Sequence, residues 1–253
     1  QHEDPTKTII GDDRVHVSQP GHFLMGYQLL KSQTGLKQVS NVLIDAKSVS
    51  AKKQDNCTIG KLRSTRQGVS FSYKAGALPF PSPKGIDPDA YVPFTSELNQ
   101  ELLKVVNLGT GHYKLTIDTS NAGVFSAADF KTGVNLALIK NTPQYRQAEK
   151  VLGLFTEYWA TERILRSLKY VEYQHFPRNF KSEDNMDEAK KLISEILERN
   201  KTTIYYDFFK SQFDIYLANK PKEHELQVKE EEIYRTIYQN NVPVVRQIKL
   251  ERL

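Results

Sequence analysis

The spacing of hydrophobic and polar positions changes along the chain, and its first 36 residues already combine two patterns. A short extended run at residues 6–10 leads into the turn-forming sequence Gly11-Asp12-Asp13. Pro20 and Gly21 then open a segment whose apolar side chains recur on one helical face. A strand, a turn and a helix in this order are typical of the last unit of an α/β layer.

Strand patterns dominate from about residue 39 to residue 134. Short runs that alternate apolar with polar residues, or are rich in β-branched and aromatic ones, occur at residues 42–46, 69–73 and 113–117. A hairpin turn is expected at residues 119–123. One helix is predicted to interrupt the strands over residues 96–106, with Ser96 as its N-cap. The pattern therefore predicts a small antiparallel β-sandwich.

Helical spacing follows from residue 143. Thr142 and Pro143 fit an N-cap followed by proline at the first helical position. The predicted helices cover residues 143–173, 185–199, 203–218 and 223–238. The tail alternates again from Pro243 and is expected to return as an edge strand. Four regions result: residues 1–36, a β-rich region at 37–140, a helical region at 141–240 and a C-terminal strand within 241–253.

Composition narrows the classes of function. Hydrophobic residues make up 39% and charged residues 26%, which is typical of soluble globular proteins. The net charge of +5 comes from 35 basic and 30 acidic residues that are interspersed, so no nucleic-acid partner is expected. No run approaches the roughly 18 apolar residues of a membrane helix, and no membrane span is expected. The single Cys57 excludes an intrachain disulfide and a multi-cysteine zinc site, and the histidines lack ligand spacing, so no metal is expected.

The strongest candidate for chemistry is an Asp-x-x-His pair, Asp13 and His16. A carboxylate three residues before a histidine, on a turn, can accept from Nδ1–H, fix the tautomer and leave Nε2 as a general base. This would be the acid–base half of a serine triad. The structural alternative is an exposed pair next to a helix start. Ser18 lies too close to His16 in the chain to serve as nucleophile, and His22 is expected to be a surface residue or a support for the pair.

The residues around this pair resemble the last motif of the SGNH (GDSL-like) hydrolase family. In that motif an Asp-x-x-His loop runs into a helix that contains Gly-His, and residues 11–25 follow the same order. Val17 departs from the family, which often has proline after the histidine. Residues 125–137 and 141–148 are similar to segments that follow the catalytic motif in secreted SGNH-type esterases. There they are expected to be structural, although Asn135 and Arg146 could approach a substrate.

This resemblance implies an α/β fold class. Residues 1–36 would be the C-terminal portion of an SGNH-type three-layer α/β/α hydrolase, followed by a β-rich, sandwich-like region and a helical region. The family places its nucleophile in a Gly-Asp-Ser motif and an oxyanion-hole asparagine in Gly-x-Asn-Asp, and the sequence contains neither. Because acyl transfer needs both groups, the nucleophile is expected on an upstream segment that was lost, cleaved or resides on another chain.

The implied function is that of a serine esterase in which Asp13 and His16 serve a serine outside this chain. The resemblance further implies an acylated carbohydrate as substrate, no cofactor, and an extracellular or periplasmic location. Two alternatives stay open. The chain could be a non-catalytic carbohydrate-binding or interaction module that works through its strands and helices, or a structural fragment that is inert without its nucleophile.

Overall fold

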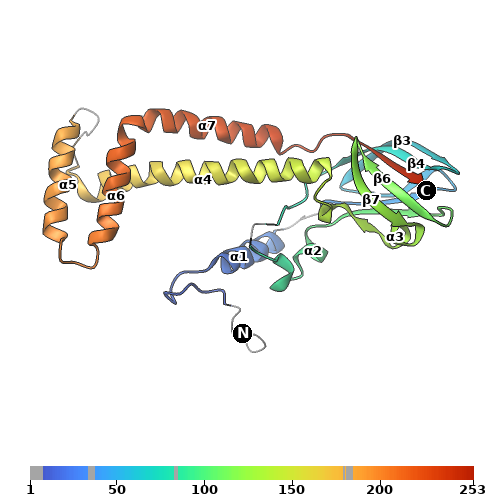
Figure 1. The fold of residues 1–253 in the computed structure, drawn as a ribbon, viewed down its shortest axis with the longest axis horizontal. Helices are drawn as coiled ribbons and strands as arrows, with labels where there is room; N and C mark the ends of the chain where they lie inside the picture. The colour runs from blue at the N-terminus through green and yellow to red at the C-terminus, as the bar shows by residue number, and fades with distance from the viewer. Residues whose placement is uncertain (1–7, 34–37, 83–84, 179, 181–184) are drawn as a thin grey trace. The chain divides into compact units, whose positions relative to one another are not determined.

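The computed structural model describes residues 8–33, 38–82, 85–178, 180 and 185–253, and it is a mixed α/β structure with two sheets and several helices (Figure 1). The chain forms two compact units. The first unit comprises Gln1–Lys150 and Asn240–Leu253, and the second comprises Val151–Gln239. Of the extended run predicted at residues 6–10, the first two residues lie outside the described parts.

The first helix, α1 (Gln19–Ser32), begins where the sequence predicts a start. The Ser18 hydroxyl caps it by accepting from the Gly21 N–H at 3.4 Å. A side chain at position 21 would collide with the Ile9 carbonyl and the Val17 side chain, so glycine allows the helix to lie directly on the preceding loop. One face of α1 packs on short elements of the first unit, with the Phe23 and Phe94 rings 5.1 Å apart.

The smaller sheet has four strands in the order β2-β1-β5-β8. They are β1 (Ser40–Asp45), β2 (Ser50–Asp55), β5 (Glu101–Val106) and β8 (Val134–Asn135). β1 and β5 are parallel, so the predicted purely antiparallel arrangement is wrong for this sheet. The helix predicted over residues 96–106 is also wrong. Only α2 (Phe94–Glu97) is helical there, and β5 follows because its alternate residues are buried between the sheets.

The larger sheet is antiparallel, with five strands in the order β3-β4-β9-β6-β7. They are β3 (Cys57–Thr65), β4 (Gly68–Ala75), β6 (His112–Ile117), β7 (Ser120–Ser126) and β9 (Arg246–Arg252). β9 pairs with β4 on one side and β6 on the other, so the predicted C-terminal strand forms but is central and not at an edge. Its buried Ile248 and Leu250 need cover that an edge position would not supply.

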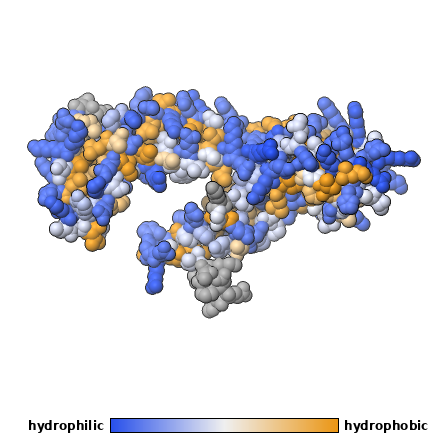
Figure 2. Space-filling model, viewed as in Figure 1, coloured by the Kyte–Doolittle hydropathy of each residue, from blue (hydrophilic) through white to orange (hydrophobic). Residues whose placement is uncertain are grey.

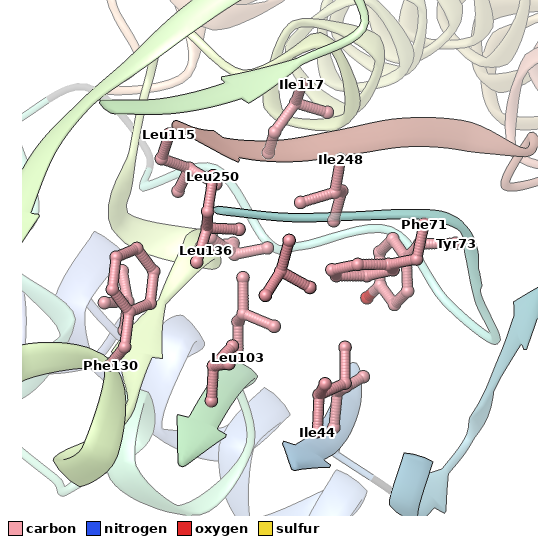
Figure 3. Close-up of a cluster of buried hydrophobic side chains, with 14 of the residues drawn as sticks. Ile44, Phe71, Tyr73, Leu103, Leu115, Ile117, Phe130, Leu136, Ile248 and Leu250 are labelled. Carbon is pink, nitrogen blue, oxygen red and sulfur yellow. The ribbon is translucent and has the colours of Figure 1, made fainter. Parts of the chain in front are cut away.

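The core of the first unit lies between the two sheets, where inward-facing side chains of both meet (Figure 3). Fully buried members include Ile44 and Leu103 of the smaller sheet and Phe71, Leu115 and Ile248 of the larger one. Burying one such side chain contributes about 1.5–3 kcal/mol relative to leaving it exposed. Short helical segments close this unit: α3 (Ala127–Thr132), η1 (Pro88–Ala90) and η2 (Leu136–Leu138).

The second unit is helical. Helix α4 (Pro143–His175) starts in the first unit and continues through the second, which also holds α5 (Met186–Asn200), α6 (Tyr206–Asn219), η3 (Lys220–Lys222) and α7 (Glu223–Asn240). These helices agree with the sequence prediction to within a few residues. Within this unit α4 and α7 run antiparallel (Figure 1), since Glu157 pairs with Lys229 at 2.9 Å and Lys169, later in α4, pairs with Glu223, earlier in α7, at 2.6 Å. Its core is formed by buried residues including Leu168, Ile193 and Phe213.

Candidate functional site

The two predicted site residues lie on one tight turn before α1. The strand-like residues Ile10 and Val17 form an isolated antiparallel bridge across the base of this turn. The Gly11 N–H donates to the His16 carbonyl at 2.7 Å, which closes the loop. Between them Arg14 adopts a left-handed conformation (φ 58°) that is uncommon for a residue other than glycine. The turn is therefore a closed backbone loop with one uncommon conformation.

Asp13 uses both of its carboxylate oxygens inside this turn. Oδ1 accepts from the Val15 N–H at 3.0 Å and from the His16 N–H at 2.9 Å. Oδ2 is hydrogen-bonded to Nδ1 of the His16 ring. The backbone contacts hold the carboxylate in place, and the carboxylate in turn holds the imidazole. The expected contact between the two side chains is thus present.

This arrangement shifts the pKa values of both groups in opposite directions. The pKa of Asp13 lies well below its usual value, chiefly because of the His16 side chain and then because of the two backbone N–H donors. The pKa of His16 is raised by its hydrogen bond to Asp13 and by the negative charge of that carboxylate. With Nδ1–H donating to Asp13, the neutral imidazole presents Nε2 as a proton acceptor. The pair can therefore work as an oriented general base.

The outer side of the pair is open. The side chains of His16 and Asp13 are 84% and 52% exposed. No side chain within the described ranges hydrogen-bonds to Nε2 of His16. Ser18 is occupied as the α1 cap and also donates to the Thr8 carbonyl at 3.4 Å, so its hydroxyl is not directed at the ring. Within the part of the chain that the structure describes, the base thus has no nucleophile hydrogen-bonded to it.

A buried polar cluster in the first unit escaped the sequence analysis. Glu101, at the start of β5, is fully buried and accepts at Oε1 from the Tyr73 hydroxyl (2.9 Å) and from Gln144 Nε2 (3.1 Å). The Ser40 hydroxyl lies 2.5 Å from the Tyr73 hydroxyl. Burial raises the pKa of Glu101 to about 7, against the opposing effect of these donors and the Arg246 charge. In a strand, Glu101 faces the same side as Leu103, which would have indicated that it is buried. The sequence predicted a helix there, so this signal was missed.

The other residues that the sequence singled out have structural contacts. Asn135 accepts from the Glu101 N–H at 2.9 Å and from the Ala137 N–H at 3.2 Å, which links β5 to the η2 turn. Thr142 caps α4 by accepting from the Tyr145 N–H at 3.3 Å, as predicted. Arg146 is exposed. These contacts support the fold and do not join the Asp13–His16 turn.

Cys57 and the possible metal ligands give no second site. Partial burial of the Cys57 thiol raises its pKa to about 11, which keeps it protonated. Among the residues that the structure describes, no group of three or more His, Cys, Asp or Glu side chains is placed to hold a metal ion. Within the same residues, none of the helices combines the length and apolar composition that a bilayer-crossing segment requires.

Comparison with known proteins finds one informative similarity. No family model and no curated protein matches the chain. Among solved structures, the chain is similar to BT4096, a gut microbial diltiazem-metabolizing enzyme, with 31% sequence identity and a TM-score of 0.80. The match covers 100% of this chain and 59% of the other. The chain thus spans about three fifths of the length of that enzyme and shares its fold over the whole matched part.

Proposed function

We propose that this chain carries the acid–base part of a serine ester hydrolase of the SGNH type. The observation on which this rests is the contact between Asp13 Oδ2 and His16 Nδ1, with the opposite ring nitrogen exposed. An aspartate that orients a histidine in this way is the arrangement that activates a serine hydroxyl. If the two side chains pointed apart, Asp13 could not orient the His16 ring and the proposal would fail.

In the proposed mechanism a serine outside this sequence attacks the ester carbonyl. Nε2 of His16 takes the hydroxyl proton as the bond to the carbonyl carbon forms, and Asp13 stabilises the resulting imidazolium. The imidazolium then protonates the leaving alcohol, and an acyl-serine is left. Water attacks this acyl group with the same histidine as base, which releases the acid and restores the serine. The proposed reaction needs no cofactor.

The surface around the turn supports a nucleophile that comes from another segment. Met25 and Leu29, four residues apart on α1, are exposed on one helical face, and Ile9 and Val15 expose apolar side chains on the adjoining loop. Exposed apolar side chains on the loop and helix that carry the general base could bind a nucleophile-bearing segment. The similar enzyme has additional chain beyond the matched part, which agrees with this proposal.

We propose an ester as the substrate because of the similar solved structure. The similar protein is an enzyme that metabolizes diltiazem, and diltiazem is itself an ester. The resemblance of the Asp13–His16 motif to SGNH hydrolases adds an acylated carbohydrate as the proposed natural substrate and an extracellular or periplasmic location. Both additions rest on that resemblance.

A second candidate, an interaction module, is favoured by where exposed aromatic side chains occur. A carbohydrate-binding sheet would be expected to carry such side chains on its strands. Within the described strands of the two sheets, Val124 is the one large apolar side chain that is exposed. Most of the exposed aromatics lie on the helices of the second unit instead, among them Trp159, Phe208 and Tyr238. This distribution favours binding through the helices over carbohydrate binding by a sheet.

The esterase proposal is tested with the intact natural polypeptide and p-nitrophenyl acetate. We expect hydrolysis, and we expect His16→Ala to reduce kcat by about 10³-fold or more. His22→Ala, which changes a neighbouring exposed histidine, is the matched control and should retain activity. Circular dichroism should show that both variants stay folded. Full activity of a folded His16→Ala variant would end the proposal.

The position of the nucleophile is tested separately with a fluorophosphonate probe and peptide mass mapping. We expect labelling of one serine outside residues 1–253, and loss of that labelling in His16→Ala. Labelling of a serine within residues 1–253 would contradict a nucleophile supplied from elsewhere.

A further inference from the structure

The antiparallel pair α4 and α7 carries a set of exposed aromatic side chains that no part of the esterase proposal uses. We call Phe155, Trp159, Tyr234 and Tyr238 the aromatic face. They are 42%, 58%, 48% and 60% exposed, respectively. Residues that are hydrophobic on the Kyte–Doolittle scale, on which Trp and Tyr are not, also reach the surface over the helices of the second unit (Figure 2). Large exposed aromatic groups of this kind are enriched where proteins bind one another.

Helical spacing places these side chains on one side of the pair. Phe155 and Trp159 are four residues apart on α4, and Tyr234 and Tyr238 are four apart on α7 with ring centroids 4.8 Å from each other. Tyr158 joins the two rows. Its ring lies 5.8 Å from Trp159 and 6.3 Å from Tyr234. The aromatic face is therefore continuous across both helices.

An ion pair between the two helices lies on the opposite side of the pair. Glu157 and Lys229 form an ion pair there at 2.9 Å. At about 100° per residue, Glu157 points about 160° away from Trp159 around α4, and Lys229 points about 140° away from Tyr234 around α7. One side of this two-helix layer thus carries an ion pair between the helices, while the other exposes aromatic rings.

We propose that the aromatic face is the contact surface of a homodimer, in which two copies pack their α4–α7 pairs into a four-helix bundle. A two-fold axis that runs between the copies parallel to the helices sets α4 of one copy against α7 of the other. Two charged residues next to the face, each one helical turn from one of its aromatic residues, suit that arrangement. Arg163 on α4 and Glu230 on α7 form no ion pair among the described residues, so each can meet its opposite charge on the second copy.

The size of the face is compatible with the centre of such an interface. Full burial of an aromatic side chain removes about 150–250 Å² from water, so covering four half-exposed ones removes about 400 Å² per copy. A stable interface needs roughly 800 Å² per partner, so these four side chains would supply about half of it. A basic and an acidic residue together, Arg163 and Glu230, also fit a second copy better than a lipid surface, which would require mainly basic residues.

Sedimentation equilibrium of the chain over the micromolar range tests the dimer. We expect twice the monomer mass of 29.0 kDa. The double substitution Trp159→Ser and Tyr234→Ser should raise the dimer dissociation constant about 100-fold or more. Tyr205→Ser is the matched control, since Tyr205 is an exposed tyrosine of the same unit that lies outside α4 and α7. It should leave the dimer unchanged.

Charge exchange gives a second readout that does not depend on the aromatic rings. Arg163→Glu should weaken the dimer about tenfold, and adding Glu230→Arg to it should restore binding. A monomer throughout the concentration range overturns the proposal, as does a dimer that the aromatic double variant leaves intact. Neither result would touch the esterase proposal, which rests on the turn before α1.

Discussion

Asp13 and Glu101 are both carboxyl groups of the first unit, and their surroundings shift their pKa values in opposite directions. Asp13 is exposed, yet hydrogen bonds from His16 and two backbone N–H groups hold its pKa below the usual value. Glu101 also accepts hydrogen bonds, from Tyr73 and Gln144, but complete burial outweighs them and raises its pKa to about 7. The number of hydrogen-bond donors alone therefore does not decide whether a carboxyl group is ionised. Burial raises its pKa, whereas hydrogen-bond donors lower it.

The two groups also differ in what they can do. The ionised Asp13 faces solvent beside an oriented imidazole, so its charge can act on a reaction. Glu101 is enclosed between a sheet and the start of α4, and its Oε2 has no hydrogen-bond partner among the described residues. The proposed function gives Asp13 a role in catalysis, whereas burial gives Glu101 a role in stability, so substitutions at the two positions should have separable effects.

The largest effect is expected from Asp13→Asn in the intact polypeptide. The amide can hold the ring in the wrong tautomer and cannot stabilise the imidazolium, so kcat for p-nitrophenyl acetate should fall about 10³–10⁴-fold. The melting temperature should change little because the side chain is exposed. Glu101→Gln serves as the control and should retain most of the activity. Equal losses of kcat in the two variants would contradict a catalytic role that is specific to Asp13.

Removing the buried group should act on stability instead. At pH 5, where Glu101 is neutral, Glu101→Ala should lower the free energy of unfolding by about 2–4 kcal/mol, since it leaves a cavity and two donors without their acceptor. Urea unfolding followed by circular dichroism measures this. Glu251→Ala, at a half-exposed glutamate on β9 that pairs with Lys249, should cost much less, because a surface ion pair contributes little. Similar costs for the two substitutions would mean that the buried cluster does not support the fold.

The raised pKa of Glu101 also predicts how stability depends on pH. Between its usual value of 4.5 and about 7, the folded state keeps a proton that the unfolded state has released. Stability from this group is therefore fully present below pH 4.5 and is lost as the pH rises through about 7, with a total change on the order of 3 kcal/mol. Glu101→Gln should remove that slope in urea titrations at a series of pH values. An unchanged slope would show that other groups cause the pH dependence of stability.

The smallest expected effect concerns the titration of His16. Its raised pKa means that the neutral base is lost as the pH falls through a midpoint above 6.5, and kcat/KM should fall with it. An NMR titration of the imidazole should place the midpoint above 6.5 in the natural protein and lower in Asp13→Asn. A midpoint that does not move would show that the carboxylate does not hold the ring in solution.

Much of the secondary structure could be predicted from sequence, and the helices were the most accessible part. Asn185 before α5 accepts from the Glu188 N–H at 3.1 Å, an N-cap contact between residues three apart. Capping and amphipathic spacing need only neighbouring residues, so a single sequence contains them. The strand β5 shows the opposite case. Ser96 and the following Glu, Leu and Lys residues favour a helix, but parallel pairing with β1 and burial of alternate residues win.

The candidate site divides in the same way. The sequence by itself determined that Asp13 can reach His16, because they lie three positions apart on a turn and their contact depends on local backbone geometry. Only the tertiary structure decided that β9 is central and that Glu101 meets Tyr73 and Gln144. These outcomes depend on strand pairing and burial between segments far apart in the chain. Such contacts form when the two sheets close on a shared core, and no local pattern specifies which partners will meet there.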